Sequence, residues 1–322
     1  MSGLVLAIPS KGRLMEAAHD LFKAAGLTIR RDNGGRGYRA AMPALDGVEI
    51  RLLSASEIAS QLAAGGVHIG LTGEDLIRES IPDADEAVHF VAPLGFGHAN
   101  VVVAAPRAWI DVATMADLED VAARLHARSG RQLRVATKYV RLTREFFARA
   151  GLRDYRIVES LGATEGAPAA GTAEAIVDIT SSGATLEANG LKVLDDGLIL
   201  ASQANLVASL RADWDDEARE HIADILTRLA AHQTAREVLE LKASVPGPAE
   251  IAEDLASRFD AAAPFGPADP LVLHVARDDA YAVAAYLRDN GAGAITMARL
   301  DAIFAPRVPA LDALEERLAS LP

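Results

Sequence analysis

The chain has 322 residues, a net charge of −13 and no cysteine, and half of its residues are hydrophobic. Its length and hydrophobic content predict two or three domains with sizeable cores. The absence of cysteine excludes disulfides, thiol nucleophiles and zinc ribbons, and the acidic charge argues against a nucleic-acid partner, which would need a basic face.

No apolar run approaches the roughly 20 residues that a membrane span needs. A short apolar segment near the N-terminus ends at Lys11 and Arg13 rather than at a cleavage site, so we expect a cytoplasmic protein with no membrane partner. The eight histidines are scattered without an HxH or HExxH pair, which predicts no metal site built by the protein alone. These properties still permit a small anionic ligand, because a pocket needs only local positive charge and aligned N–H groups.

Strands alternate with helices over roughly the first 210 residues, which predicts an α/β fold with parallel sheets. The uninterrupted apolar run at 4–8 predicts a strand buried on both faces, and helical spacing follows from Leu14 to a cap at Gly26. The next unit repeats this order with a strand, a helix and a strand, at 50–53, 56–64 and 67–71. Further strands and helices are predicted at 100–106, 109–127, 133–152, 155–161, 173–179 and 191–209.

The pattern changes after a long amphipathic helix that begins at Asp215. A β-α-β-α-β order follows over about eighty residues, which predicts a small α+β domain of the ferredoxin-like kind. We place the domain boundary near residue 225. A proline-bearing tail, residues 305–322, ends in a short helix to which the sequence assigns no role.

The stretch after the predicted strand at 173–179 has the ingredients of an anion-binding loop. Asp178 lies near the end of the strand, and it is followed by mostly small residues that let backbone N–H groups approach a phosphate: Thr180, Ser181, Ser182, Gly183, Ala184 and Thr185. Three or four such hydrogen bonds, at roughly 1.5–3 kcal/mol each, would hold one phosphate. The alternative is an ordinary strand-to-helix turn with Ser and Thr as caps. A Walker loop is excluded, because no lysine follows the last glycine.

Two further loops follow predicted strands. Lys11 and Arg13 lie where a helix begins, and because cations oppose the helix dipole there, ligand binding is favoured over two solvated charges. In the other loop, Gly73 and Glu74 are candidate substrate contacts. N-capping of the next helix is nevertheless sufficient to explain the carboxylates of Glu74 and Asp75.

A local basic cluster follows the strand near 133–137. Lys138, Arg141 and Arg144 concentrate positive charge in an acidic protein, which fits an anionic substrate. The alternative is an amphipathic helix with a solvated basic face. Glu165 adds a carboxylate from another loop, and it has no more specific interpretation from the residues alone.

Several stretches together resemble ATP phosphoribosyltransferase, the first enzyme of histidine biosynthesis. The stretch from Asp178 to Leu186 is the strongest single match, and any one stretch alone would be weak. The matching segments lie in order along the chain: AIPSKGRL, GLTGEDLI, VATKYVRLTREFF, GATEGAPAAGTAEAIVDITSSGATLEANGL and the strand around 203–207.

The resemblance implies a two-lobed catalytic core like that of periplasmic binding proteins. Residues 1–105 and 186–224 would form lobe I, and residues 106–185 would form lobe II. The implied reaction transfers the 5-phosphoribosyl group from phosphoribosyl pyrophosphate (PRPP) to N1 of ATP and releases pyrophosphate. Mg²⁺ is the implied cofactor, held mainly by the pyrophosphate rather than by protein ligands.

The resemblance also assigns roles to residues. Lys11 and Arg13 would meet the leaving pyrophosphate or the ATP phosphates, and Glu165 and Asp178 would take ribose hydroxyls. Such a reaction needs positioning and charge stabilisation rather than a nucleophile, since pyrophosphate departs from an oxocarbenium-like ribose.

In lobe II, the N–H groups of residues 181–185 would bind the 5′-phosphate of PRPP, and Thr180 belongs to the same loop. Lys138 and Tyr139 match the stretch that lines the same cleft in the family. Here Val140 stands where the family usually has proline, so this loop departs from the family pattern.

Residues 225–322 resemble the regulatory domain of the family's long forms, which implies histidine as an inhibitor and a homo-oligomer, either a dimer or a hexamer. The stretch at 259–275 lacks the Leu-Pro-Gly turn expected there. The rival interpretation is a non-catalytic cytoplasmic small-anion-binding module of the same two-lobed fold, which leaves the basic loops unexplained.

Overall fold

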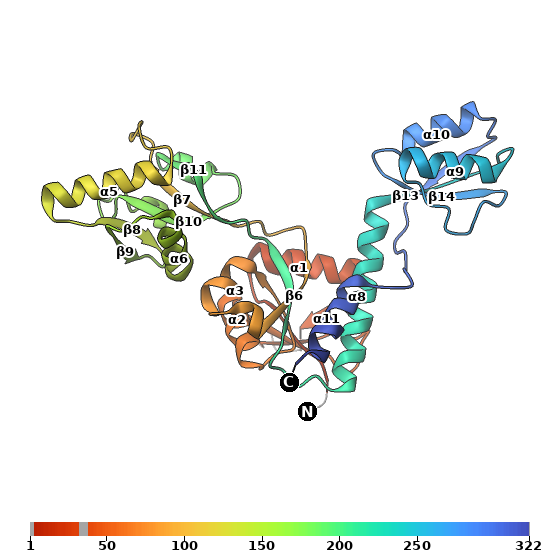
Figure 1. The fold of residues 1–322 in the computed structure, drawn as a ribbon. Coiled ribbons are helices and arrows are strands. Elements are labelled where there is room, and N and C mark those ends of the chain that lie inside the picture. The colour runs from red at the N-terminus through yellow and green to blue at the C-terminus, as the bar shows by residue number, and fades with distance from the viewer. Residues whose placement is uncertain (1–2, 32–37, 322) are drawn as a thin grey trace.

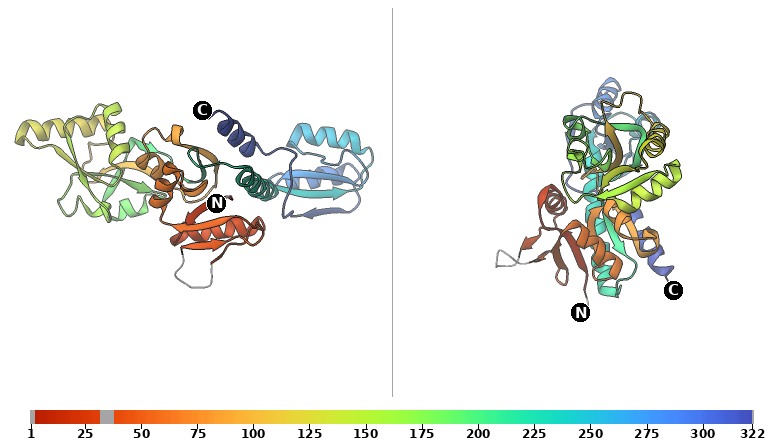
Figure 2. Two further views of the ribbon diagram at one scale, coloured as in Figure 1. Left: turned by 90° about the horizontal axis from the view of Figure 1, so that it is seen from below. Right: turned by 90° about the vertical axis from the view of Figure 1, so that its left-hand side faces the viewer.

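The structure, a computed structural model, describes residues 3–31 and 38–321. Three β-sheets divide these residues into two α/β lobes and a C-terminal domain, with the long helix α8 (Asp216–Glu237) leading into the third part (Figure 1). Lobe II and the C-terminal domain extend to opposite sides of lobe I (Figure 2). The predicted fold, a two-lobed α/β core like that of periplasmic binding proteins with a small α+β domain, is confirmed.

Lobe I is built on a seven-stranded sheet in the order β2-β3-β4-β1-β5-β12-β6. Its strands are β1 (Val5–Pro9), β2 (Arg30–Arg31), β3 (Arg39–Ala41), β4 (Glu49–Leu53), β5 (Ile69–Gly73), β6 (Val88–Pro93) and β12 (Ala204–Ser209). Its helices are α1 (Gly12–Ala24), α2 (Ala55–Ala64), α3 (Glu74–Ser80) and α4 (Ala84–Ala87). Strands β4, β1 and β5 are parallel, whereas β12 runs antiparallel to both of its neighbours.

Strand β1 is apolar along its whole length because both faces of the sheet are covered. Leu6 and Ile8 enter one hydrophobic cluster, whereas Ala7 enters a second cluster with Ile58 and Leu62 of α2. Alternate residues of a strand point to opposite faces, so a strand with a core on each side needs an uninterrupted apolar run.

Lobe II is built on a five-stranded sheet in the order β11-β7-β10-β8-β9. Its strands are β7 (Asn100–Pro106), β8 (Leu133–Thr137), β9 (Tyr155–Glu159), β10 (Ala175–Thr180) and β11 (Leu191–Leu200). Its helices are α5 (Met115–Ser129), α6 (Val140–Ala150), the 3₁₀ turn η1 (Thr164–Gly166) and α7 (Ala184–Ala188). Strands β10, β8 and β9 are parallel, so their carboxyl ends meet at one edge of the sheet.

The boundaries between the two lobes differ from the predicted ones at residues 105 and 186. Strands β7 and β11 pair with each other inside lobe II, so the chain crosses between the lobes at 94–99 and at 201–203. The two crossings run side by side, because the N–H of Ala99 donates to the carbonyl of Ser202 at 2.9 Å. Hydropathy marks both strands as buried, but it does not reveal which sheet a buried strand joins.

The C-terminal sheet has the order β14-β13-β15 with antiparallel neighbours. The domain consists of β13 (Val238–Ala243), α9 (Pro248–Phe259), β14 (Leu271–Ala276), α10 (Ala280–Asp289) and β15 (Ile295–Ala298). One isolated bridge, Ala262 to His274, stands where a ferredoxin-like sheet would have its fourth strand beside β14. The predicted domain boundary at residue 225 falls inside α8. It is too early, because Ile225 and Leu229 of this helix are packed into the core of lobe I.

Within the described ranges, no helix is long and apolar enough to cross a membrane.

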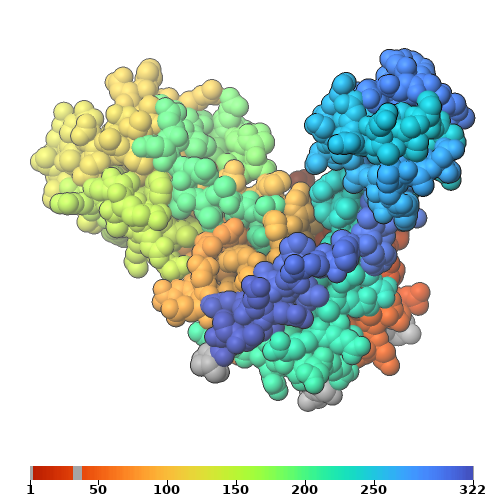
Figure 3. Space-filling view, turned by 45° about the vertical axis from the view of Figure 1, so that its right-hand side comes forward, coloured from red at the N-terminus to blue at the C-terminus, as the bar shows by residue number. Residues whose placement is uncertain are grey.

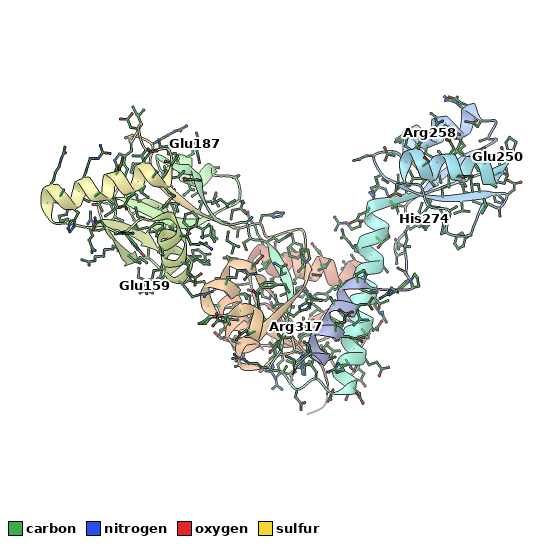
Figure 4. The ribbon with its side chains drawn as sticks, viewed as in Figure 1. Glu159, Glu187, Glu250, Arg258, His274 and Arg317 are labelled. Carbon is green, nitrogen blue, oxygen red and sulfur yellow. The ribbon has the colours of Figure 1, made fainter. Side chains whose placement is uncertain are left out.

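The last helix, α11 (Pro309–Ala319), returns to lobe I instead of belonging to the C-terminal domain. Leu314 and Leu318 are buried in the core of lobe I, and Arg317 donates to the carbonyl of Asp85 at 2.9 Å. The space-filling view shows α11 lying across lobe I (Figure 3), and Arg317 is labelled on it in Figure 4. The C-terminal domain is therefore tied to lobe I at both of its ends.

Candidate active site

Two sets of loops lie at the carboxyl ends of parallel strands. In lobe I, the loops after β1 and β5 are neighbours because these strands pair directly. In lobe II, the loops after β8 and β10 are neighbours for the same reason. Open parallel sheets bind ligands at this edge, and all the residues that the sequence singled out, except Glu165 and the two arginines of α6, lie on or beside these four loops.

The loop after β10 surrounds a cavity of about 170 Å³, which is large enough for a phosphate group. Its lining comes from the loop, the end of β10, the start of α7 and one interlobe crossing: His98, Ala99, Ile179, Thr180, Ser181, Ser182 and Thr185. The Thr180 hydroxyl accepts from the N–H of Gly183 at 2.7 Å, which closes the turn. Gly183 has φ +78°, a conformation that side-chain-bearing residues rarely adopt.

Three N–H groups of this loop have no acceptor among the described residues. They belong to Ser181, Ser182 and Thr185. Backbone N–H groups that lack a partner need an acceptor from water or a ligand. Because the same residues line the cavity, the loop has the donors that the predicted anion site requires.

A cluster of three charges lies beside this loop. Burial raises the pKa of the Asp178 carboxyl, while a hydrogen bond from the N–H of Ile179 and the charge of Lys138 oppose that shift. The nearby Glu165 carboxylate raises the pKa of Asp178 further. The charges of Glu165 and Lys138 therefore act on the Asp178 carboxyl, and two acceptor carboxylates with one ammonium group suit a ligand rich in hydroxyls and negative charge.

Tyr139 does not offer its hydroxyl to a ligand, contrary to its predicted role as a substrate contact. Its side chain is only 1% exposed, and its hydroxyl donates to Oδ2 of Asp75 at 2.7 Å. Burial raises the pKa of Tyr139 far above its ordinary value, and the Asp75 carboxylate adds to this effect. The hydroxyl therefore remains a donor to Asp75, and only the neighbouring Lys138 is exposed beside the cluster.

In the loop after β5, the capping interpretation of the two carboxylates is wrong. Neither side chain caps α3. Glu74 instead forms an ion pair with Arg78 at 2.6 Å, and Asp75 accepts from Tyr139 and Ser202. Glu74 is thus already engaged by the protein, and Gly73 serves the packing of Asp75, since a Cβ at Gly73 would lie 2.2 Å from Oδ1 of Asp75.

Lys11 and Arg13 are exposed at the end of β1. Neither cation forms an ion pair or a side-chain hydrogen bond with any residue within 3–31 or 38–321. They lie in the other lobe from Asp178, and no contact joins them to the charge cluster. Both cations are available to a ligand from the lobe I side.

The predicted basic cluster is divided in the structure. The charge of Lys138 acts on Asp178, whereas Arg141 donates to Glu145 at 2.9 Å and to the carbonyl of Arg78. Arg144 lines a separate cavity of about 430 Å³ on the outer edge of lobe II. The three cations therefore do not share one site.

Sequence reasoning missed three residues near these loops, Glu79, His98 and Ser202, and it assigned Asp75 only a capping role. Glu79 accepts from the N–H groups of Arg141 and Leu142 at 2.9 and 3.0 Å, so a residue of lobe I caps a helix of lobe II. These contacts join positions more than 60 residues apart, and no local pattern announces them.

A larger cavity, of about 700 Å³, lies away from the charge cluster. It is bordered by α1, α8 and the interlobe crossing near Gly95 and Gln203. It contains none of the predicted site residues, and its lining is mostly apolar. Size alone therefore does not identify the reaction site, because phosphate recognition needs N–H donors and cations.

Among the described residues, no group of three or more His, Asp or Glu side chains is arranged to hold a metal ion. The carboxylates of Asp178 and Glu165 are hard oxygen donors, and the charge of Glu165 acts on Asp178. Such a pair fits an ion that takes most of its ligands from a substrate.

Comparison with known proteins gives consistent results. Residues 54–231 match the HisG family, described as ATP phosphoribosyltransferase. An ATP phosphoribosyltransferase of Nitrobacter winogradskyi is 56% identical over 98% of each chain, and one of Rhodopseudomonas palustris is 55% identical over the same share. An ATP phosphoribosyl transferase (HisG:HisZ) complex from Thermotoga maritima has a TM-score of 0.54 at 24% identity, covering 70% of this chain and 95% of that chain. The last likeness concerns the fold alone.

Proposed function

The chain belongs to the ATP phosphoribosyltransferase family and transfers the 5-phosphoribosyl group of PRPP to N1 of ATP in the first step of histidine biosynthesis, and from that premise we propose that PRPP binds at the loop after β10. The observation that carries this proposal is the phosphate-sized cavity lined by residues 179–182 and Thr185 beside Asp178. The alternative of a non-catalytic binding module is set aside, because relatives named as enzymes match almost the whole chain.

In the proposed complex, the 5′-phosphate accepts from the N–H groups of Ser181, Ser182 and Thr185. Hydrogen bonds to a charged group contribute about 1.5–3 kcal/mol each. The carboxylates of Asp178 and Glu165 then accept from the ribose hydroxyls. This orientation is supported by the position of both carboxylates at the same edge of lobe II as the cavity.

The reaction breaks the bond between C1 of the ribose and a pyrophosphate oxygen, while the lone pair of adenine N1 forms the new bond to C1. Positive charge develops on the ribose ring and negative charge on the leaving group. Asp178 stabilises the former, and we assign Lys11 and Arg13 of lobe I to the pyrophosphate or the ATP phosphates. Preorganised charges of this kind act without any covalent intermediate.

Mg²⁺ is the proposed cofactor, and Asp178 with Glu165 would supply its protein contacts. When bound, the ion neutralises charge on the pyrophosphate and so improves it as a leaving group. The two carboxylates suit this role because burial raises the pKa of Asp178, the Glu165 carboxylate raises it further, and a bound cation would favour the ionised form.

We also propose that histidine inhibits the enzyme through the C-terminal domain, that the enzyme is a homo-oligomer, either a dimer or a hexamer, and that it acts in the cytoplasm. Support for regulation comes from the connections at α8 and α11, through which a change in this domain would reach lobe I. Histidine titrated against turnover checks the first claim, and unchanged turnover at saturating histidine would reject it.

The substitution Asp178→Asn tests the assignment of the site. It retains the size of the side chain but removes the charge that stabilises the ribose, so we expect kcat/KM for PRPP to fall by about 100-fold. The KM for ATP should change little. The matched control is Asp195→Asn, which removes an exposed carboxylate from β11 of the same lobe. Equal kinetics of the two variants would refute the assignment.

A further inference from the structure

A chain of three buried polar side chains connects the two lobes. Asp75 at the start of α3 is 4% exposed, Ser202 in the second crossing is 3% exposed, and Tyr139 before α6 is 1% exposed. Oδ2 of Asp75 accepts from the Tyr139 hydroxyl at 2.7 Å, and Oδ1 accepts from the Ser202 hydroxyl at 3.0 Å. The N–H of Asp75 donates back to Ser202 Oγ at 3.0 Å. We call these three residues the interlobe triad.

The interlobe triad favours one orientation of the lobes. Both oxygens of the Asp75 carboxylate have partners, one from lobe II and one from the crossing. A buried carboxylate that loses a partner is strongly destabilised, because no water replaces the lost hydrogen bond. Rotation of lobe II away from α3 would remove Tyr139 from Asp75 and incur this cost.

A second set of contacts holds the same two helices together. Glu79 of α3 accepts from the first N–H groups of α6, those of Arg141 and Leu142. Leu76 of α3 packs against the hydrophobic core of lobe II. The triad therefore lies at the end of an interface that already joins α3 to α6, and it adds directional contacts to apolar packing.

The position of Lys138 depends on Tyr139. The ammonium group of Lys138 lies 5.0 Å from the centre of the Tyr139 ring, and its charge reaches Asp178. Because the two residues are adjacent in the chain, a hydroxyl bond that fixes the tyrosine ring also fixes the path of the backbone at Lys138. The lysine then stands beside the carboxylate that meets the ribose.

We propose that Asp75 is a positioning residue, which acts through Tyr139 to hold Lys138 and lobe II in the geometry required for phosphoribosyl transfer. Asp75 itself is buried and touches no substrate. This inference rests on the proposed PRPP site, since Lys138 and Asp178 matter only if PRPP binds there.

Two substitutions separate positioning from mere stabilisation. Tyr139→Phe removes one hydroxyl and keeps the buried ring, so we expect kcat/KM for PRPP to fall by roughly 10- to 100-fold through misplacement of Lys138. Asp75→Asn keeps an oxygen to accept from Tyr139 and gains an amide to donate to Ser202. It should therefore remain within about threefold of the wild type, since the partners are preserved. If Tyr139→Phe does not fold, Ser202→Ala removes the partner of the other Asp75 oxygen and should lower kcat/KM in the same direction.

The matched control is Tyr155→Phe. Tyr155 also lies in lobe II, where its ring packs edge-on against Phe147 at 4.9 Å, but it lies away from the charge cluster. This variant should keep wild-type kinetics, whatever its Tm.

The distance between the lobes provides a readout that a change of stability alone would not affect. Because the chain contains no cysteine, Ala64→Cys and Ala123→Cys place one label on each lobe at exposed helical positions. We expect a broadened distribution of interlobe distances in Tyr139→Phe and an unchanged one in Asp75→Asn and Tyr155→Phe. A Tyr139→Phe enzyme with wild-type kcat/KM and wild-type distances would overturn the proposal, even if its Tm were lower. Asp178→Asn in the same assay keeps the two proposals apart, because wild-type kinetics there would reject the PRPP site itself.

Discussion

The loops after β5 and β10 share two kinds of residue but differ in how their polar groups are bonded. Each combines glycine with a nearby acidic residue at the carboxyl end of a strand. In the β5 loop, protein groups engage the acids: Arg78 pairs with Glu74, and Tyr139 and Ser202 bind Asp75. In the β10 loop, the N–H groups of Ser181, Ser182 and Thr185, which line the cavity, have no acceptor among the described residues.

This difference teaches how to separate structural from ligand-binding polar groups. A buried group with all of its hydrogen bonds made inside the protein must lose one before it can serve a ligand. A polar group without a partner inside the protein gives up only a bound water when it binds a ligand. The β5 loop therefore joins the lobes, and the unpaired N–H groups described in the β10 loop can serve the phosphate of PRPP that we propose to bind there.

The largest expected effect on stability comes from Gly73→Ala. A Cβ at this position would lie 2.2 Å from Oδ1 of Asp75, so the carboxylate must move and the interlobe triad must open. We expect a loss of about 1–3 kcal/mol in the free energy of unfolding, as for other overpacked sites. Thermal or urea unfolding measures it. Gly293→Ala, where nothing lies within 4 Å, is the control and should stay close to the wild type.

A substitution in the other loop, Gly183→Ala, should have a different signature. Its Cβ would meet no atom within 4 Å, so only the left-handed backbone at φ +78° is strained, at a cost of about 1 kcal/mol. Because the same backbone carries the phosphate donors, we expect the KM for PRPP to rise about tenfold. Gly171→Ala has equal strain at φ +68° and open space, but it lies outside the loop. A similar KM in both variants would remove the distinction between the loops.

The pH dependence of the enzyme should report the environment of Asp178. Burial raises its pKa, so kcat/KM for PRPP should decline on acidification at a higher pH than an ordinary aspartate would give.

A raised carboxyl pKa also means that the folded state binds the proton more tightly than the unfolded state, so ionisation of Asp178 lowers stability as pH rises. Asp178→Asn should therefore unfold at a higher Tm than the wild type at neutral pH but not in acid. A lower Tm at neutral pH would contradict this explanation.

The smallest effect is expected from Glu74→Gln. This change removes an ion pair with Arg78 whose side chains are 23% and 32% exposed, and partly exposed pairs contribute about 0–1 kcal/mol. Turnover should be unchanged within error, because the carboxylate serves its own helix. A rise in the KM for either substrate would return Glu74 to the binding site and weaken the contrast between the two loops.

The sequence predicted elements best where one signal dominates. The apolar strand Asn100–Pro106 was predicted to the residue. Strand β5 was predicted two residues early, because buried Thr72 ends the apolar run before the strand ends. Local patterns locate elements but not the sheet to which a strand belongs, which explains the displaced lobe boundaries.

The candidate site was predictable only where its residues are contiguous in the sequence. Asp178 and the loop after it are contiguous, so their small residues could be read as one anion-binding unit. The bond from Tyr139 to Asp75 spans 64 positions and crosses the lobes, so each residue was given a local role that the fold does not support. Contacts between lobes depend on how the two sheets are placed, which no stretch of sequence encodes by itself.

The central claim is that the N–H groups of the β10 loop bind the phosphate of PRPP. The most direct measurement follows the amide resonances of ¹⁵N-serine-labelled enzyme during titration with ribose 5-phosphate. Ser181 and Ser182 should shift progressively, whereas Ser54, whose side chain and N–H are engaged in the capping box of α2, should not. Unshifted amides at Ser181 and Ser182 under saturating ligand would contradict the proposed site.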